Sequence, residues 1–141
     1  MGRNQLSLWC SIAVVACAGV AVGQEAVRVA QRAFPATVLI STIDTKGQQL
    51  ALGSGFKIGP GLIATNYHVV ENAAAATVKL IREQRVHNAT NISRVDLRND
   101  LAILSVPTLA GPNLTLGDSS NLQIGESVYA VGNPKGLEGS F

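Results

Sequence analysis

One histidine in this sequence stands where a side chain can take part in proton transfer. His68 comes shortly after the apolar run Leu62–Thr65, which reads as a strand preceded by a tight turn at Gly59–Gly61. A sheet would fix the backbone at the end of such a strand while the imidazole ring faces an open edge, and imidazole readily accepts and returns protons near neutral pH. A half-buried histidine bonded to the backbone would give the same local pattern, so His68 needs support from a second element.

An aspartate about thirty residues later lies at the start of another predicted strand. Asp100 comes immediately before the apolar run Leu101–Leu104, which places its carboxylate at the mouth of that strand. An isolated aspartate before a strand is usually a turn residue, and this alternative stands for Asp100 taken alone.

The segments around these two residues resemble the trypsin-like serine proteases, and among them the HtrA/Deg branch. The resemblance covers roughly Ala36 to the last residue, and its motifs come in the order that the family has. The matching segments are Thr65–Val70, Asn99–Leu104, Leu116–Ser120, Ile124–Glu126 and Ala130–Pro134. Several motifs in one order are far more specific than any one of them, so the resemblance favours a chemical role for His68 and Asp100.

The resemblance implies an all-β, trypsin-like double β-barrel with a catalytic triad. His68 would be the general base and Asp100 the carboxylate that orients its ring, so we expect their side chains within hydrogen-bond reach. The nucleophilic serine, the oxyanion hole and the substrate pocket would all follow residue 141. We therefore expect a serine-type endopeptidase, present here as an inactive fragment that lacks its nucleophile. The alternatives are a non-catalytic exported barrel that binds protein segments and a merely structural exported β domain.

One segment, Gly117–Ser119, has a short sequence that also occurs in the nucleophile loop of such enzymes. Gly117-Asp118-Ser119 matches a Gly-Asp-Ser sequence, but no pair of glycines follows Ser119 to build an oxyanion hole. The spacing from Asp100 is also too short to cross a second barrel. We interpret Ser119 and Ser120 as parts of a polar turn.

Composition and charge narrow the expected partners and cofactors. The chain of 141 residues has room for about one domain, and its formal charge of +2 is too small to favour nucleic acid or an anionic membrane. Neither His68 nor His87 has a cysteine or a paired carboxylate at ligand spacing, so we expect no metal and no cofactor. By resemblance, the partners are unfolded or misfolded protein substrates, and association into a homo-oligomer remains open.

The first 23 residues have the pattern of an export signal. Met1–Gly23 carries Arg3 near its start, an apolar run over Leu6–Val22 and a small-residue exit at Ala21–Gly23. An uncleaved membrane anchor and a lipoprotein signal at Cys17 are alternatives, because the run is near the lower limit for spanning. All three readings export the domain to a periplasmic or extracellular location. Only an uncleaved or lipidated leader would attach it to a membrane.

The rest of the chain predicts a short helix followed by one barrel. Residues 24–35 form a short helix or linker that ends at Pro35 and packs on the outside of the barrel. Residues 36–107 form a six-stranded first barrel, and residues 108–141 form the connection and the incomplete start of the second barrel. The six strands are predicted over Ala36–Ile43, Leu50–Ile58, Leu62–Thr65, Thr77–Ile81, Asn91–Leu97 and Leu101–Val106.

Three smaller features complete the predicted first barrel and the start of the second. Gly53 and Gly55, inside one predicted strand, indicate a bend or a close backbone approach. Tyr67–Asn72 predicts one helical turn. Val128–Val131 predicts an apolar strand with an unpaired edge.

Overall fold

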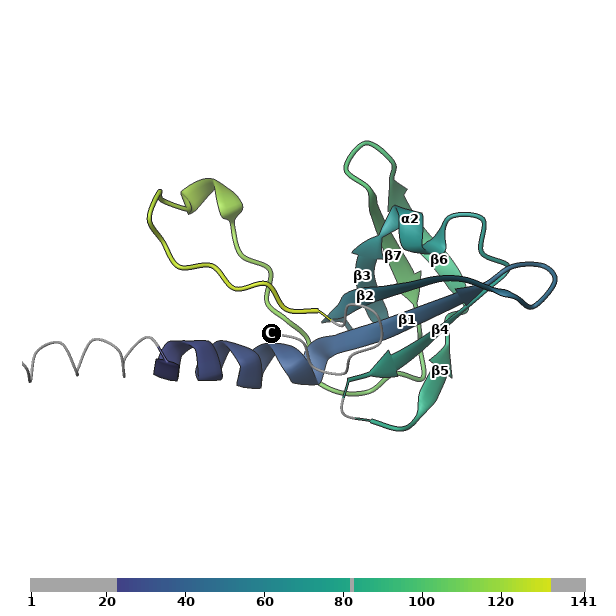
Figure 1. The fold of residues 1–141 in the computed structure, drawn as a ribbon, viewed down its shortest axis with the longest axis horizontal. Helices are drawn as coiled ribbons and strands as arrows, with labels where there is room; N and C mark the ends of the chain where they lie inside the picture. Colours follow the sequence, from purple (N-terminus) through teal and green to yellow (C-terminus); the bar gives the residue numbers. More distant parts are fainter. Residues whose placement is uncertain (1–22, 82, 133–141) are drawn as a thin grey trace, which may run out of the picture.

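The computed structural model describes residues 23–81 and 83–132. Within this range the chain forms one strongly curled sheet, with a short helix at one end and a longer helix that projects away (Figure 1). The predicted leader lies outside the described residues, apart from Gly23. Among the helices described, none is long and apolar enough to cross a bilayer.

Seven antiparallel strands make up the sheet, in the spatial order β5-β4-β1-β2-β3-β7-β6. They are β1 (Thr37–Ile43), β2 (Gln49–Gly59), β3 (Leu62–Asn66), β4 (Ala75–Leu80), β5 (Val86–Asn88), β6 (Asn91–Asp96) and β7 (Leu101–Ser105). β3 and β7 are neighbours although they are far apart in sequence. Asn66, the last residue of β3, pairs with Leu101, the first residue of β7. The sheet topology therefore brings the predicted strand ends that carry His68 and Asp100 together.

The prediction of six strands was one strand short. The additional strand, β5, has only three residues and pairs with the edge strand β4, where His87 lies opposite Val78. Because β5 is too short to show an alternating apolar pattern, periodicity cannot mark it. Its strand character comes from pairing with β4, which is a tertiary contact.

The residues that follow β5 link the two edges of the curled sheet. Ala89 N donates to Ala76 O of β4 at 2.9 Å, and Thr90 N donates to Ser105 O of β7 at 2.8 Å. Two successive residues thus bond to strands that lie on opposite sides of the sheet order. This linkage holds the sheet in its barrel-like curl.

Apolar side chains that alternate along the strands fill the interior. Val38 and Ile40 of β1 and Ile63 of β3 are fully buried, and Leu104 of β7 is 1% exposed. Burying each of these side chains contributes roughly 1.5–3 kcal/mol. Ile63 lies directly opposite Leu104, so the core holds the register of β3 against β7.

Gly55 in β2 lies against its neighbours with no room for a side chain. A Cβ atom at this position would lie 2.8 Å from Ala64 O and from Ile40 Cδ1. The predicted close approach at the glycines of this strand is confirmed.

The first helix was predicted to pack on the outside of the barrel, and this prediction is wrong. It is helical over residues 23–33 and projects away from the sheet (Figure 1). Of its described residues only Ala33 is buried, and Val27 is 55% exposed. Its apolar side chains are few and small, and the strands already fill their own core, so the helix gains little by folding back. It ends at the 3₁₀ turn η1 (Phe34–Ala36), where Thr37 Oγ1 donates to Ala33 O at 2.8 Å.

The described chain after β7 is irregular. The predicted strand Val128–Val131 is not a strand, and it pairs with none of the seven strands that the structure describes. One 3₁₀ turn, η2 (Ser119–Asn121), interrupts the segment, and the Asp118 side chain caps it by accepting from Ser120 N at 3.0 Å. The predicted polar turn at Ser119 and Ser120 is confirmed.

Candidate active site

A single helical turn carries His68 at the end of β3. This turn is α2 (Tyr67–Val70), close to the helical turn predicted over Tyr67–Asn72. Val69 and Val70 are buried beneath it, whereas the His68 side chain is 66% exposed. Two buried valines thus fix the turn and leave the imidazole ring on the outer side.

Asp100 lies at the end of a tight turn that leads into β7. Its backbone has the left-handed conformation, with φ of 52°, which aspartate tolerates better than most residues. Asp100 O accepts hydrogen bonds from Tyr67 N at 3.1 Å and from Asn66 Nδ2 at 3.2 Å. The two strand ends are therefore joined by backbone contacts as well as by side chains.

The turn before Asp100 is held by its own hydrogen bonds. Asn99 donates to Asp96 twice, from its backbone N at 3.1 Å and from its Nδ2 at 2.7 Å. These bonds, chiefly the one from the Asn99 side chain, lower the pKa of Asp96. The turn that presents Asp100 is thus stabilised while Asp96 is ionised.

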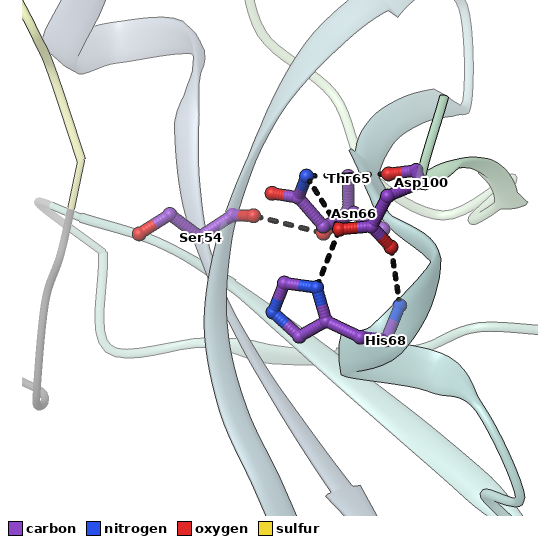
Figure 2. Close-up of polar contacts among 5 residues, drawn as sticks. All are labelled: Ser54, Thr65, Asn66, His68 and Asp100. Atoms are coloured by element: carbon purple, nitrogen blue, oxygen red, sulfur yellow. Dashed lines mark hydrogen bonds and ion pairs between the residues drawn. The ribbon is translucent and has the colours of Figure 1, made fainter. Parts of the chain in front are cut away.

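The side chains of His68 and Asp100 face each other (Figure 2). His68 Nδ1 lies 2.6 Å from Asp100 Oδ2, and His68 N donates to Asp100 Oδ1 at 2.9 Å. Asn66 Nδ2 lies 3.3 Å from Asp100 Oδ2, which adds a third donor to this carboxylate. The expected approach of the two side chains within hydrogen-bond reach is present.

These hydrogen bonds favour the ionised form of Asp100. The backbone N–H of His68, followed by its side chain, lowers the pKa of the Asp100 carboxyl below its ordinary value. An ionised carboxylate only accepts hydrogen bonds, so the facing Nδ1 atom of His68 must carry the hydrogen. In a neutral ring, Nε2 then holds the free electron pair and can accept a proton.

The free side of the imidazole ring faces away from the carboxylate. In Figure 2, Asp100 lies at one edge of the His68 ring and the second ring nitrogen points to the other side, toward the part of the view where Ser54 lies. The side-chain exposure of 66% leaves this edge accessible. The arrangement can remove a proton from a group placed at Nε2 while Asp100 stabilises the resulting imidazolium.

Asn66 and Thr65 support the site and were missed in the sequence. Asn66 bonds to both the carbonyl and the carboxylate of Asp100, and Thr65 Oγ1 donates to Ser54 O at 2.8 Å, which joins β3 to β2. Their place two and three residues before His68 was the available signal. Nothing in the residue types alone distinguishes this role from ordinary strand residues.

The other predicted polar residues lie apart from this pair. His87 is buried on β5, where its Nδ1 atom lies 2.9 Å from Thr108 Oγ1. Ser120 Oγ donates to Asp118 in the η2 turn. No group of three or more histidine, cysteine, aspartate or glutamate side chains that could hold a metal occurs in the part of the chain that the structure describes.

The sequence matches a known domain family over more than half of its length. Residues 53–141 match the sequence profile of the trypsin-like peptidase domain. This range contains both His68 and Asp100.

Similar proteins and a similar structure were also found. A probable periplasmic serine endoprotease, DegP-like, from Halomonas elongata is 43% identical over 94 residues, which are 66% of this chain and 19% of that protein. Anti-sigma-I factor RsgI9 from Acetivibrio thermocellus is 32% identical over 102 residues, which are 72% of this chain and 14% of that protein. The crystal structure of the serine endoprotease from Yersinia pestis aligns with a TM-score of 0.68 and 30% identity, over 78% of this chain and 39% of that one. The chain thus spans less than two fifths of each of these proteins.

Proposed function

This chain belongs to the trypsin-like peptidase domain family, and from that premise we propose that it is part of a serine endopeptidase in which His68 and Asp100 are two members of the triad. The observation that carries the proposal is the 2.6 Å contact from His68 Nδ1 to Asp100 Oδ2, with the other edge of the ring exposed. A ring held in this way presents Nε2 to a nucleophile.

In the proposed reaction His68 acts as the general base. Its Nε2 atom takes the hydroxyl proton of a serine as the serine oxygen attacks the peptide carbonyl carbon, and it returns that proton to the leaving amine. Asp100 keeps the ring in the required tautomer and stabilises the imidazolium. We place the nucleophilic serine after residue 141, because no serine up to there is followed by a pair of glycines that would build an oxyanion hole, and Ser119 and Ser120 belong to a capped polar turn. The residues up to 141 would then be inactive alone.

We propose unfolded or misfolded exported proteins as the substrates. An extended chain can pair with an exposed strand edge beside the site, whereas a folded protein cannot readily offer such a segment. The export pattern of Met1–Gly23 and the periplasmic location in the Halomonas relative's name support an exported setting.

The test is hydrolysis of casein by the protein that includes the residues after 141. His68→Ala should lower kcat by about 10⁶-fold and Asp100→Asn by about 10⁴-fold, in line with triads in other enzymes. Glu71→Ala, an exposed change three residues from His68, is the matched control and should keep its activity. A serine-directed phosphonate should abolish turnover and a metal chelator should not.

Two outcomes would reject this proposal. Full turnover by His68→Ala, or activity that a chelator removes, would show a different reaction class. Binding of unfolded casein without any hydrolysis would instead support the alternative of a non-catalytic barrel that binds protein segments.

A further inference from the structure

A charged side chain lies inside the barrel, away from the candidate active site. Lys57 of β2 is 2% exposed and has the largest fully buried side chain among the described residues. Lysine is almost never fully buried unless its ammonium group has partners. In the β2–β3 ladder it lies opposite the core residue Ile63.

The Lys57 ammonium group bonds to the chain that leaves β7. Its Nζ atom donates to Gly111 O at 2.7 Å and to Leu109 O at 3.2 Å. The backbone of the same residue takes part, because Leu114 N donates to Lys57 O at 2.8 Å. One residue of β2 therefore holds three positions of this segment, which we call the connection (residues 107–114).

Gly111 presents its carbonyl oxygen to the ammonium group from an unusual backbone conformation. Its φ angle of 105° is one that residues with a side chain rarely adopt. A Cβ atom at Gly111 would lie 4.0 Å from Lys57 Nζ and 3.7 Å from Leu80 Cδ1, so the glycine backbone lies close over the end of the barrel. The backbone conformation at this point suits the contact with Lys57.

The start of the connection is also attached to the barrel. Val106 N donates to Gly61 O at 2.7 Å, and Thr108 Oγ1 lies 2.9 Å from His87 Nδ1. These contacts end at Thr108. Beyond that residue, the contacts of Lys57 described above hold the connection, together with the bond from Leu109 N to Val106 O and the burial of the Leu109 side chain in the core.

Burial of this ammonium group has a free-energy cost. Desolvation lowers the pKa of Lys57, and the negative charge of Glu83 opposes this effect. An apolar side chain of similar length would fill the same space without that cost. A lysine at this buried position is therefore explained if its hydrogen bonds to Leu109 O and Gly111 O serve to hold the connection in place.

We propose that Lys57 fixes the connection across the end of the barrel and so sets the direction in which the chain leaves it. The ammonium group supplies donors to two carbonyl groups that face it from the connection. Its role is separate from the His68–Asp100 pair, which lies at the far end of β3.

Hydrogen exchange on the intact chain, with the variant Lys57→Met, tests this role. Methionine has a similar length and is apolar, so the core stays filled while both donors are lost. We expect the amides of Leu109 and Leu114, at the connection, to exchange about tenfold faster or more. The amides of β1 and β2 should keep their protection.

The matched control is Ile40→Val, a small loss of packing on β1 that leaves every hydrogen bond of the connection in place. It should change exchange in the barrel without a selective change at Leu109 and Leu114. Unchanged exchange at these two amides in Lys57→Met would overturn the proposal, and so would an equal loss of protection everywhere. If Lys57→Met does not fold, Lys57→Leu, which also has no donor, is measured in the same way, and the same two results decide.

Discussion

At the scale of single residues, the site depends on Asp100, whose three oxygen atoms each contact a different group. One carboxylate oxygen accepts from the backbone of His68 and the other faces its ring, while the carbonyl oxygen accepts from Tyr67 N. The carboxylate thus fixes both the start of α2 and the orientation of the ring. A site built in this way ties the geometry of the ring to the ionisation of one carboxyl group.

The acid stability of the protein should reveal this link. Because folding lowers the pKa of Asp100, its ionised form stabilises the folded chain above the ordinary aspartate pKa of about 3.9, and this contribution is lost as the pH falls through the lowered folded value. The free energy of unfolding of the wild type minus that of Asp100→Asn should therefore rise with pH below about 3.9 and stay level from there to about pH 5. Chemical denaturation of both proteins at a series of pH values measures this difference in the free energy of unfolding.

Comparing the wild type with Asp100→Asn isolates the contribution of Asp100 to the pH dependence of stability. Asp96 and Asp118 also have lowered pKa values, but both residues are present in each protein, so their contributions cancel. A difference that does not vary with pH below 4 would show that the hydrogen bonds of Asp100 do not favour its ionised form.

At the scale of elements, α2 is positioned by the strand that runs beneath it. Gly53 of β2 faces Val69, and a Cβ atom at Gly53 would lie 2.5 and 2.7 Å from the two methyl carbons of Val69. Thr42 Oγ1 of β1 adds a hydrogen bond to Val69 O at 3.1 Å. The turn that carries His68 thus lies directly on the sheet, with no space between them.

Gly53→Ala should therefore destabilise the protein and displace α2. Valine has a stiff, branched side chain that cannot move aside, so we expect a cost of about 1–3 kcal/mol. Adding Val69→Ala should recover part of it, because the clashing methyl groups are removed. Denaturation of the two single variants and the double variant measures the coupling, and strictly additive costs would mean that the two residues do not meet.

At the scale of the whole molecule, the described chain after the connection exposes large apolar side chains. Ile124 is fully exposed, and Leu116, Leu122 and Val128 are between 60% and 76% exposed. Leu116 also borders an apolar hollow of about 380 Å³ on the outer face of β2, β3, β6 and β7. Surfaces of this kind drive association in water.

We predict that residues 24–141 produced alone associate in a concentration-dependent way. Ile124→Lys should shift sedimentation velocity profiles toward the monomer, because it replaces a fully exposed apolar side chain with a charge. Gln123→Lys adds the same charge next to it without removing apolar surface, and should change association much less. A monodisperse monomer at every concentration, with one sharp unfolding transition, would contradict this view of the segment.

Strand positions and the two candidate residues could be read from the sequence because their signals are local. Alternating apolar residues and a glycine turn mark β2 and β3, and the same reasoning places His68 and Asp100 at strand ends. The family resemblance then named their proposed roles. The short strand β5 carries no such local signal, and pairing with β4 decided its structure.

Only the tertiary structure decided which distant groups meet. The bonds of Asn66 to Asp100 and of Lys57 to Gly111 join residues 34 and 54 positions apart, and they depend on how the sheet curls. The outward course of the first helix has the same origin, because an amphipathic pattern states which face is apolar but not whether a surface is free to receive it. Local periodicity sets where strands begin and end, whereas packing and hydrogen bonding across the sheet set what each side chain touches.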